Sequence, residues 1–467
     1  MEMTKKYNVL FFFTDDQRFD TINALGNSEI ETPNIDKLVK RGTTFTQAHI
    51  PGGTVGAVCL PSRAMLHTGK TLFHLHKNGA VVPENHILMG ETFQKAGYRT
   101  FGTGKWHNGT KAYARSFTDG AEIFFGGMQD HWNVPAYNFD STGQYDMVKK
   151  QVKSQLNSNK VSFNICDHIT PGKHSSELFC ETASNWLNNY NYDNPFFMYI
   201  SFMAPHDPRT MPDKFLKMYD PDKIKIPKNY VSEHPFDYGV RAIRDELLAP
   251  YPRSEKEVQR HIAEYYGMIS HLDNELGKVI NTLKKSGMYE DTIIIFAADN
   301  GLALGQHGLM GKQNAYEHSI RVPLIFAGPN IPENKKCDTY VYLLDIYPTL
   351  CDVLGFEKPD SVEGISFKEC FYNKEVKTRK TLYFAFSSIL RAVKDDRYKL
   401  IEYRNDTFKK TQLFDLWNDP YEKNNLISKY DYKDIIEKLK LEMKRYCNEW
   451  NDKEHPKGER FWSYFNM

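Results

Sequence analysis

Four short apolar segments of this sequence each run into polar residues whose side chains can do chemistry. The segments are Tyr7–Phe13, Arg99–Gly102, Phe196–Phe202 and Thr292–Ala298. Oxygen-bearing side chains follow the first and the last, and a lysine and histidines follow the middle two: Asp15, Asp16, Lys105, His107, His206, Asp299 and Asn300. Carboxylate and amide oxygens can hold a metal ion, whereas lysine and histidine can bind anions and move protons.

The apolar segments predict the elements that position these residues. Aromatic and branched residues bounded by turn formers are typical of buried strands, and Pro323–Ala327 predicts a fifth strand. Helices are expected at Pro33–Arg41, Ser175–Asn189 and Glu257–Ser286. Gly267 and Gly277 lie inside the last of these and predict a bend or a break there.

This alternation through about residue 350 predicts an α/β fold, a large mainly parallel sheet sandwiched by helices. After about residue 375 the pattern changes to strands at Thr381–Phe386, Leu390–Val393 and Tyr398–Tyr403, and then a helix at Tyr432–Trp450. We therefore predict a large domain over residues 1–375 and a smaller C-terminal α+β subdomain with an antiparallel sheet over residues 376–467.

The polar residues should meet at one edge of the large sheet, because ligands of open α/β sheets bind beyond the carboxyl ends of the strands. The oxygen set Asp15, Asp16, Asp299 and Asn300 suits Ca²⁺ or Mg²⁺ rather than a soft metal. A single aspartate at a strand end is more often a turn former or a helix cap. Two such groups after apolar strands favour a metal site.

Cys59 is the one cysteine whose surroundings point to chemistry. Pro61 can occupy the first turn of a short helix and Gly69 can end it, so Cys59 would stand at the positive end of that helix. Anions bind at such a position, and the pKa of a thiol falls there. These residues alone predict a thiolate nucleophile, with a structural cysteine as the alternative.

Composition excludes several classes of protein. The 467 residues carry 60 Lys and Arg against 59 Asp and Glu, a net charge of +1 that points neither to nucleic acid nor to a membrane surface. The seven cysteines are irregularly spaced without a C-x-x-C, which argues against a disulfide framework and a zinc–thiolate site.

The apolar stretch near the start, Val9–Phe13, is too short for a signal peptide, and no run reaches the roughly 18 apolar residues that span a bilayer. As given, the sequence predicts a cytoplasmic protein without a membrane span. A chain trimmed of a leader would be periplasmic or secreted instead. The sequence leaves the oligomeric state open.

Five motifs in this order resemble those of the type I sulfatases in the alkaline phosphatase superfamily. They are the early D-D, C-x-P-S-R at Cys59–Arg63 followed by Thr68-Gly69-Lys70, G-K-W-H, A-P-H and D-N-G, and the segment from Gln412 to Leu426 resembles the family's C-terminal motif. The resemblance covers nearly the whole chain. Lys70 stands where the family usually has arginine.

The resemblance implies a role for each motif residue. Cys59 would be converted to formylglycine by a sulfatase-maturating enzyme, and its hydrate would be the nucleophile. Asp15, Asp16, Asp299 and Asn300 would hold a cation, usually Ca²⁺, with residue 59 completing the shell. Arg63 would steady the formylglycine, and Lys105 and Lys312 would bind sulfate oxygens. His107 would assist collapse of the hydrate, and His206, as an imidazolium, would face the leaving oxygen.

Substrate contacts are harder to predict. His131, Trp132, Lys173, His174 and Arg209 are candidates, although each fits an ordinary surface or core position about as well; Arg209 has the better claim because it lies three residues after His206. Arg321, before a strand, is expected to be structural. The loops that bear aromatic, histidine and lysine residues, together with the resemblance to carbohydrate-active bacterial members of the family, favour a sulfated sugar. Lys173 and Arg209 add cations for a carboxylate or a second sulfate, as in a sulfated uronic acid or amino sugar from a glycosaminoglycan fragment.

Three alternatives remain. A phosphonate monoester or phosphodiester hydrolase of the same superfamily would share the nucleophile. A two-zinc phosphatase would need a second, histidine-rich site, which the sequence does not show. A non-catalytic sulfate- or glycan-binding relative is disfavoured because every expected catalytic position is filled.

Overall fold

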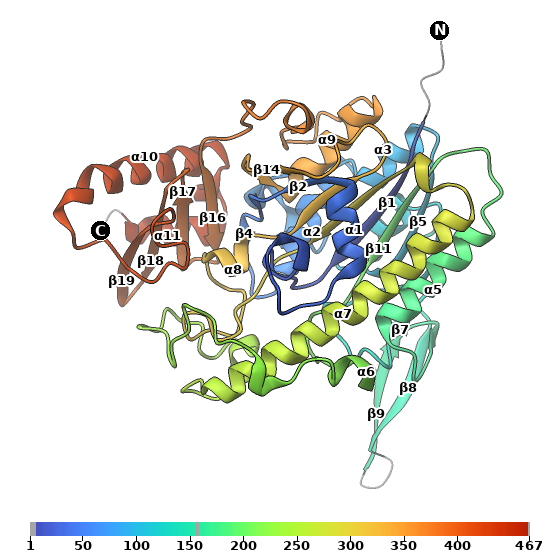
Figure 1. The fold of residues 1–467 in the computed structure, drawn as a ribbon, viewed down its shortest axis with the longest axis horizontal. Helices are drawn as coiled ribbons and strands as arrows, with labels where there is room; N and C mark the ends of the chain where they lie inside the picture. The colour runs from blue at the N-terminus through green and yellow to red at the C-terminus, as the bar shows by residue number, and fades with distance from the viewer. Residues whose placement is uncertain (1–5, 155–157, 466–467) are drawn as a thin grey trace.

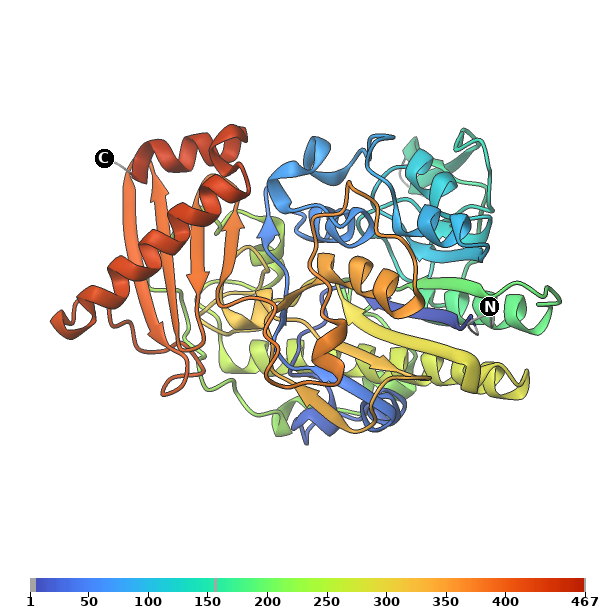
Figure 2. The same cartoon turned by 90° about the horizontal axis from the view of Figure 1, so that it is seen from above.

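Two sheets lie side by side, and the larger one carries the polar strand ends at one edge (Figures 1 and 2). The computed structural model describes residues 6–154 and 158–465, and the side chains of residues 148–165 are left out of the description. The first residues of the chain, which entered the prediction of localisation, lie outside this range.

The large sheet has eight strands in the order β14-β2-β13-β12-β1-β11-β5-β6. The five strands from β12 to β6 are parallel, while β13 is antiparallel to both of its neighbours, so the predicted mainly parallel sheet is confirmed. The bounds are β1 (Asn8–Thr14), β2 (Gly42–Phe45), β5 (Arg99–Lys105), β6 (Asp119–Phe124), β11 (Phe196–Ser201), β12 (Thr292–Ala298), β13 (Leu324–Ala327) and β14 (Lys335–Cys337).

Both faces of this sheet are covered by helices, which explains why its strands are apolar throughout. In β1, Phe11 and Phe13 belong to one core, whereas Leu10 and Phe12 belong to the other. Helices α2 (Cys59–Thr68), α3 (Met89–Lys95) and α9 (Ile346–Leu354) contribute to the first core, and α1 (Pro33–Arg41), α5 (Ser175–Asn188) and α7 (Glu255–Lys285) to the second. A strand buried on both faces has no polar side.

Helix α7 runs unbroken through both of its internal glycines, so the predicted break is absent. A Cβ at Gly267 would lie 2.6 Å from Met211 Sδ, and one at Gly277 would lie 2.5 Å from Asn34 Nδ2. The glycines therefore admit neighbouring segments against the helix, and tertiary packing outweighs their low helix propensity.

The second sheet contains β4 (Gly52–Gly53), β16 (Leu382–Phe386), β17 (Leu390–Lys394), β18 (Tyr398–Asn405) and β19 (Phe408–Asp415). The last four strands form the predicted antiparallel meander, with α10 (Lys433–Glu449) and α11 (Pro456–Phe465) packed on it. Sequence reasoning missed β19. Strand β4 pairs parallel with β16, although it lies shortly before Cys59 in the chain. The domain boundary at residue 375 stays a prediction.

Short elements complete the fold: β3 (Ala48–His49), β7 (Pro135–Ala136), β8 (Val148–Ser154), β9 (Ser158–Ile165), β10 (His168–Ile169), β15 (Val341–Tyr342), α4 (Thr110–Ser116), α6 (Asp213–Leu216) and α8 (Glu317–Ile320). Within the described ranges, none of the helices combines the length and the apolar character needed to cross a membrane. All seven cysteines are buried, and none of them forms a disulfide in the described part of the chain.

The second sheet should depend on one buried carboxylate. Asp452 accepts bonds from Arg391 Nε (2.7 Å) and Nη2 (2.8 Å), from the Tyr383 hydroxyl (2.6 Å) and from Trp462 Nε1 (2.7 Å). Because Asp452→Ala leaves the Arg391 charge buried and unpaired, we expect it to lower the free energy of unfolding by about 3–5 kcal/mol in urea titrations.

The matched control is Asp213→Ala, which removes an ion pair with Lys217 on the surface. That change should alter the free energy of unfolding by less than about 1 kcal/mol. Equal effects of the two substitutions would contradict the role given to Asp452.

Candidate active site

The carboxyl ends of β1 and β12 bring the predicted oxygen ligands together. The Asp16 backbone N–H donates to Asp299 Oδ1 over 3.0 Å, and Asn300 Nδ2 donates to Asp16 Oδ1 over 2.6 Å. Candidate ligand atoms of Asp15, Cys59 and Asp299 lie within 4.8 Å of one another. All these residues are buried, so the convergence predicted from the four strand ends is present in the structure.

The donor set fits a hard cation. Asp15 Oδ1 and Asn300 Oδ1 are buried oxygens without a hydrogen-bond partner among the described residues. Buried polar atoms are almost always partnered, so two orphaned oxygens beside three carboxylates indicate a missing positive partner. Asp16 has a φ of 63°, a left-handed conformation that is uncommon for a residue other than glycine. This backbone turn lets consecutive aspartates face one centre.

The electrostatics of the carboxylates point the same way. Burial opposes ionisation of Asp15, but the charges of Lys105, His206 and Arg63 bring its pKa well below the usual value. Burial, together with the charge of Asp15, raises the pKa of Asp299 to about 7. Two adjacent buried carboxylates cannot both ionise easily without further positive charge. A divalent cation would supply that charge.

Helix α2 delivers Arg63 to these carboxylates. The helix begins at Cys59 and ends at Gly69, which takes the left-handed conformation with φ 65°, as predicted. Arg63 Nε donates to Asp299 Oδ2 (2.8 Å), and Nη1 donates to Ser201 Oγ (2.6 Å) at the end of β11. The guanidinium thus fixes Asp299 and ties the helix to two strands.

Cys59 lies where a nucleophile is expected, but not as a thiolate. Its Sγ is 3.6 Å from His107 Nδ1 and 3.7 Å from Lys105 Nζ. Burial raises the pKa of the thiol above its ordinary value, although Lys105 and Lys312 act in the opposite direction. The expectation of a low pKa at the helix start is therefore wrong, because desolvation outweighs the nearby positive charges.

Two buried lysines flank the carboxylates. Lys105 Nζ is ion-paired with Asp15 and donates to Gly127 O over 2.5 Å. Lys312 Nζ donates to Asp16 Oδ1 over 2.6 Å, and although burial opposes it, the charge of Asp16 holds its pKa well above the ordinary value. Lys312 is thus a member of the centre and not a surface lysine.

The two predicted catalytic histidines, His107 and His206, differ in pKa and in hydrogen-bond partners. Burial lowers the pKa of His107 to about 2 and that of His206 to about 4, so both rings are neutral near pH 7. A neutral His107 can accept a proton. The imidazolium expected at His206 is not the form that its surroundings favour. Its Nε2 lies 3.6 Å from Asp16 Oδ2, and its Nδ1 is 2.8 Å from Asp207 O.

The predicted substrate contacts divide into two groups. His131 and His174 are fully buried: His131 bonds Ser175 Oγ (2.7 Å) and His206 O (3.0 Å), and His174 caps α5 by accepting from the Ser176 N–H. These side chains support the loop after β11, and both rings are enclosed by protein. Trp132 packs edge-on against His174.

The other two candidates for substrate contact are Lys173 and Arg209, and their contacts differ. Lys173 is ion-paired with Glu181 on α5 and contacts none of the central side chains. Arg209 Nη1 bonds His261 Nδ1 over 2.7 Å, while its Nε and Nη2 are buried without a partner among the described residues. Arg209 therefore has hydrogen-bonding capacity that its protein neighbours leave unused.

Sequence reasoning missed three polar residues of this region. Ser201 orients Arg63, Asp207 lies against His206, and Arg244 pairs with Asp207, with Nη1 2.9 Å from Asp207 Oδ1. Asp207 could have been found, because it directly follows His206. Arg244 comes from a distant loop without a motif, and only the folded structure shows it beside the site.

Comparisons with known proteins agree with this geometry. The family model described as Sulfatase matches residues 7–356, and that described as N-sulphoglucosamine sulphohydrolase, C-terminal, matches residues 305–449. A sulfatase from Formosa agariphila is 31% identical, covering 96% of this chain and 88% of the relative. An N-acetylglucosamine-6-O-sulfatase from Bacteroides thetaiotaomicron is 25% identical, covering 98% and 90%.

Solved structures share the whole fold. A protein in complex with its substrate D-glucosamine-2-N,6-O-disulfate superposes with a TM-score of 0.76 at 22% identity, covering 97% of this chain and 99% of that one. A phosphonate monoester hydrolase of Agrobacterium radiobacter gives 0.73 at 22% identity, covering 94% and 96%. The metal-type centre and these matches define a member of the alkaline phosphatase superfamily. Within it, this chain belongs to the sulfatase family and is a sulfuric ester hydrolase.

His131 should act through His206. Its Nε2 is 3.0 Å from His206 O, so His131→Phe removes a bond that fixes the loop carrying the catalytic ring. We expect kcat on a sulfate ester to fall about 10- to 100-fold with KM nearly unchanged, because small displacements of a catalytic group are costly.

His271→Phe is the matched control. The His271 ring packs against His174 at 4.6 Å in the same cluster, but it makes no bond to the loop after β11. This variant should keep the wild-type kcat. An equal loss of kcat in both variants would show that His131 and His271 contribute only through packing.

Proposed function

We propose that this sulfatase hydrolyses O-sulfate esters of carbohydrates, with formylglycine formed from Cys59 and a bound Ca²⁺. The observation that carries the proposal is the position of Cys59 at the start of α2, within 3.7 Å of Lys105 Nζ and beside the oxygen set. A cysteine whose thiol is protonated is a poor nucleophile, which supports its conversion to another group.

Asp15, Asp16, Asp299 and Asn300 would hold the cation, since they are hard oxygen donors with two atoms unpartnered. Hydrated formylglycine supplies a nucleophilic oxygen and a second hydroxyl that allows sulfate to leave, while the cation increases the acidity of the hydrate. Ca²⁺ suits this set better than Mg²⁺, which demands stricter octahedral geometry.

The positions of the two lysines and the two histidines suggest a different role for each pair. Lys105 and Lys312 bring ammonium groups to the carboxylate cluster and would bind the sulfate oxygens on which charge accumulates. His107, neutral and 3.6 Å from Cys59 Sγ, would accept the proton that is released at residue 59. His206 presents Nε2 to the leaving oxygen, because its Nδ1 is engaged by Asp207 O. A negatively charged ester beside this ring favours its protonated form.

A carbohydrate substrate is supported by the relatives and by the site's polar margin. Similar proteins include an N-acetylglucosamine-6-O-sulfatase, an ulvan-active sulfatase and a solved 2-O glycosaminoglycan sulfatase. Arg244, which is paired with Asp207, and Arg209, which has two unpartnered nitrogens, would pair with a carboxylate or a second sulfate of a uronic acid or amino sugar.

The second candidate is phosphonate monoester or phosphodiester hydrolysis. It is favoured by the similarity to a phosphonate monoester hydrolase and to a multifunctional alkaline phosphatase superfamily protein from Trinickia caryophylli, which is 26% identical. The reacting groups would be the same.

Turnover separates the two candidates. Matured enzyme with Ca²⁺ should cleave position-defined sulfated mono- and disaccharides with a higher kcat/KM than aryl phosphonate, and Cys59→Ala should show no turnover above the uncatalysed rate. Faster cleavage of the phosphonate would reject the sulfatase proposal. Activity confined to simple aryl sulfates would reject a carbohydrate substrate.

The state of residue 59 provides the control. Mass spectrometry of the peptide containing Cys59 should show sulfur and two hydrogens replaced by one oxygen in active preparations. Active enzyme with an intact thiol at this position, or full activity of Cys59→Ala, would overturn the mechanism.

Calcium binding can be tested without turnover. Loss of an outer-shell partner weakens metal binding about 10- to 100-fold, so Asp299→Asn should raise the Kd for Ca²⁺ by at least about 100-fold in calorimetry. Asp245→Asn is the control, since Asp245 bonds Gln313 and is not part of the oxygen set. Unchanged affinity in Asp299→Asn would exclude the assigned ligands.

A further inference from the structure

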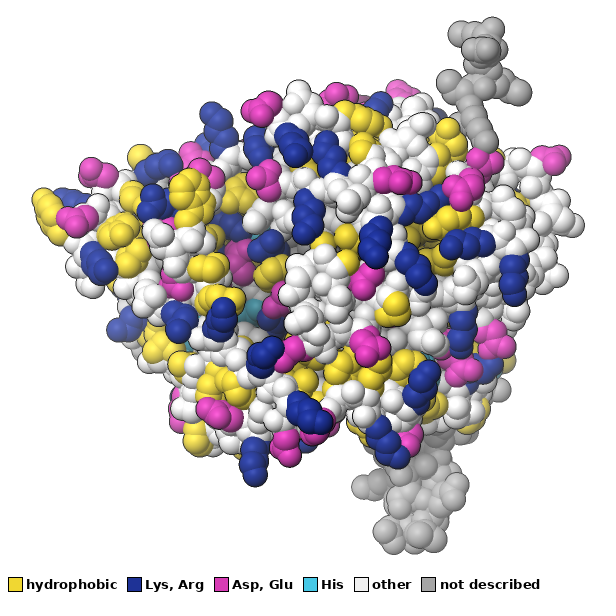
Figure 3. All heavy atoms as spheres, in the orientation of Figure 1, with side chains coloured by type: hydrophobic (Ala, Val, Ile, Leu, Met, Phe, Trp, Pro, Cys, Tyr) yellow, Lys and Arg dark blue, Asp and Glu magenta, His cyan; other side chains and the backbone are white. Residues whose placement is uncertain are grey.

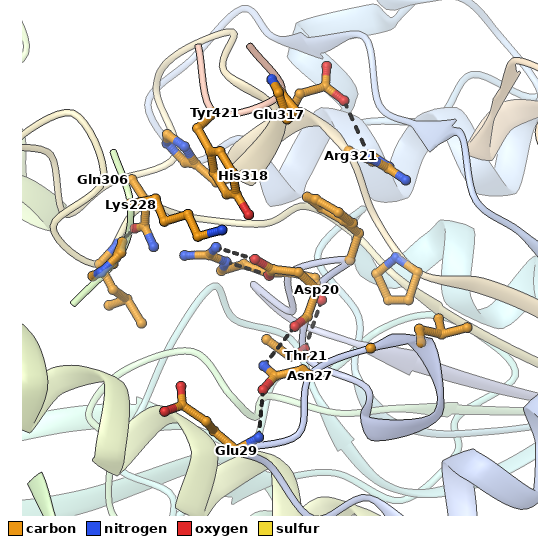
Figure 4. Close-up of a pocket in the computed structure, with 18 of the residues that line it drawn as sticks. Asp20, Thr21, Asn27, Glu29, Lys228, Gln306, Glu317, His318, Arg321 and Tyr421 are labelled. Carbon is orange, nitrogen blue, oxygen red and sulfur yellow. Dashed lines mark hydrogen bonds and ion pairs between the residues drawn. The ribbon is translucent and has the colours of Figure 1, made fainter. Parts of the chain in front are cut away.

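A second polar cavity lies apart from the catalytic centre. It has a volume of about 540 Å³, within the roughly 300–1,000 Å³ range of small-molecule sites. Five segments that are distant in sequence form its wall, together with part of α7 and Lys336 of β14: residues 18–29, 44–46, 225–229, 304–323 and 420–422. Figure 4 shows side chains from these segments facing one another around the open space. Neither Cys59 nor the histidines and lysines of the centre line it.

The charges in this wall are unbalanced once its internal ion pairs are counted. Each carboxylate of the wall already has a cation of its own, two from the wall and two from β17 and β18: Asp20–Arg18 (2.5 Å), Glu29–Lys225 (3.4 Å), Glu317–Lys394 (2.9 Å) and Glu422–Lys399 (2.6 Å). In the described part of the chain, Lys228 and Lys336 have no such partner. The charge left over for a ligand is therefore positive, and an anionic group fits it.

The cavity also offers a ring-stacking surface. Tyr421 is 41% exposed, and Lys228 Nζ lies 4.9 Å from the centre of its ring. Figure 4 places Tyr421 and Lys228 together on one side, with Gln306 next to them. An exposed tyrosine presents an apolar face and a hydroxyl, which matches a sugar ring that carries polar substituents.

Access from solvent is open. In Figure 3 the surface is hollowed where α8 lies in Figure 1, and Lys and Arg side chains stand around the hollow. One residue of the wall, Tyr265, also contacts the candidate metal site. Tyr265, which lines the cavity, donates to Asp16 O over 2.5 Å and accepts from the Arg18 N–H over 2.9 Å.

We propose that this cavity binds a sulfated sugar unit of the polymer on which the enzyme acts, at a place separate from the bond that is cleaved. Lys228 and Lys336 would pair with the sulfate group, and Tyr421 would stack on the sugar ring. This inference rests on the proposed carbohydrate function. A sugar chain long enough to reach both this cavity and the catalytic centre should bind more tightly than a short substrate, because binding at one site raises the effective concentration of the chain at the other.

The test is binding to catalytically inert protein. In the Cys59→Ala background, calorimetry would compare a size-defined heparin hexasaccharide, the same hexasaccharide after desulfation, and sodium sulfate. Adding Lys228→Met or Tyr421→Ala should raise the Kd for the sulfated hexasaccharide about five- to tenfold, the loss expected for one charge-assisted or stacking contact. Desulfated hexasaccharide should bind weakly to every variant.

Lys223→Met is the matched control, since Lys223 lies on the same loop but is paired with Asp220 and does not line the cavity. It should leave the Kd unchanged. In the active background, Lys228→Met should keep kcat/KM for a monosulfated monosaccharide, which also shows that the variant is folded. Loss of that activity in the parent enzyme would count against the proposed function and not against the cavity.

Two results would overturn the inference. One is an unchanged Kd for the sulfated hexasaccharide in both Lys228→Met and Tyr421→Ala. The other is a Lys228-dependent binding of sodium sulfate with no Lys228 dependence for the hexasaccharide, which would make the cavity a site for free sulfate only.

Discussion

The structure of the catalytic centre depends on one constraint: three carboxylates and three cationic side chains share one buried volume. Asp15, Asp16 and Asp299 would repel one another in a low-dielectric interior. Arg63, Lys105 and Lys312 compensate that repulsion from three different elements. The strands and helices must therefore meet with little freedom, because any element that drew back would leave a buried charge unpaired.

This constraint also explains why most of the centre could be predicted from the sequence. Charged residues directly after buried apolar strands have nowhere to lie except at the sheet edge, and parallel strands bring those edges together. The bounds of β12 and α1 match their predicted ranges, because their apolar patterns and end signals agree. The position of Lys312 in a glycine-rich loop became predictable only through the resemblance of the surrounding motif.

The errors have physical causes. A charged form was predicted for Cys59 from its place at a helix start and for His206 from its role in the family, whereas burial, which sequence patterns do not report, governs both. His131 and His174 lie in loop-like sequence but are enclosed by α5 and the loop after β11. Strands β2, β14 and β19 are short or polar, so no periodic pattern distinguishes them from loops.

The pairing of β4 with β16 has a consequence in time. Residues 52–53 reach their final partner only after residues 382–386 have left the ribosome, so the stretch that leads into Cys59 stays incomplete until nearly the whole chain exists. In the finished fold Cys59 is 2% exposed, so a protein-sized reagent cannot reach its sulfur. The thiol is therefore open to such a reagent only while this region of the chain is still unfolded.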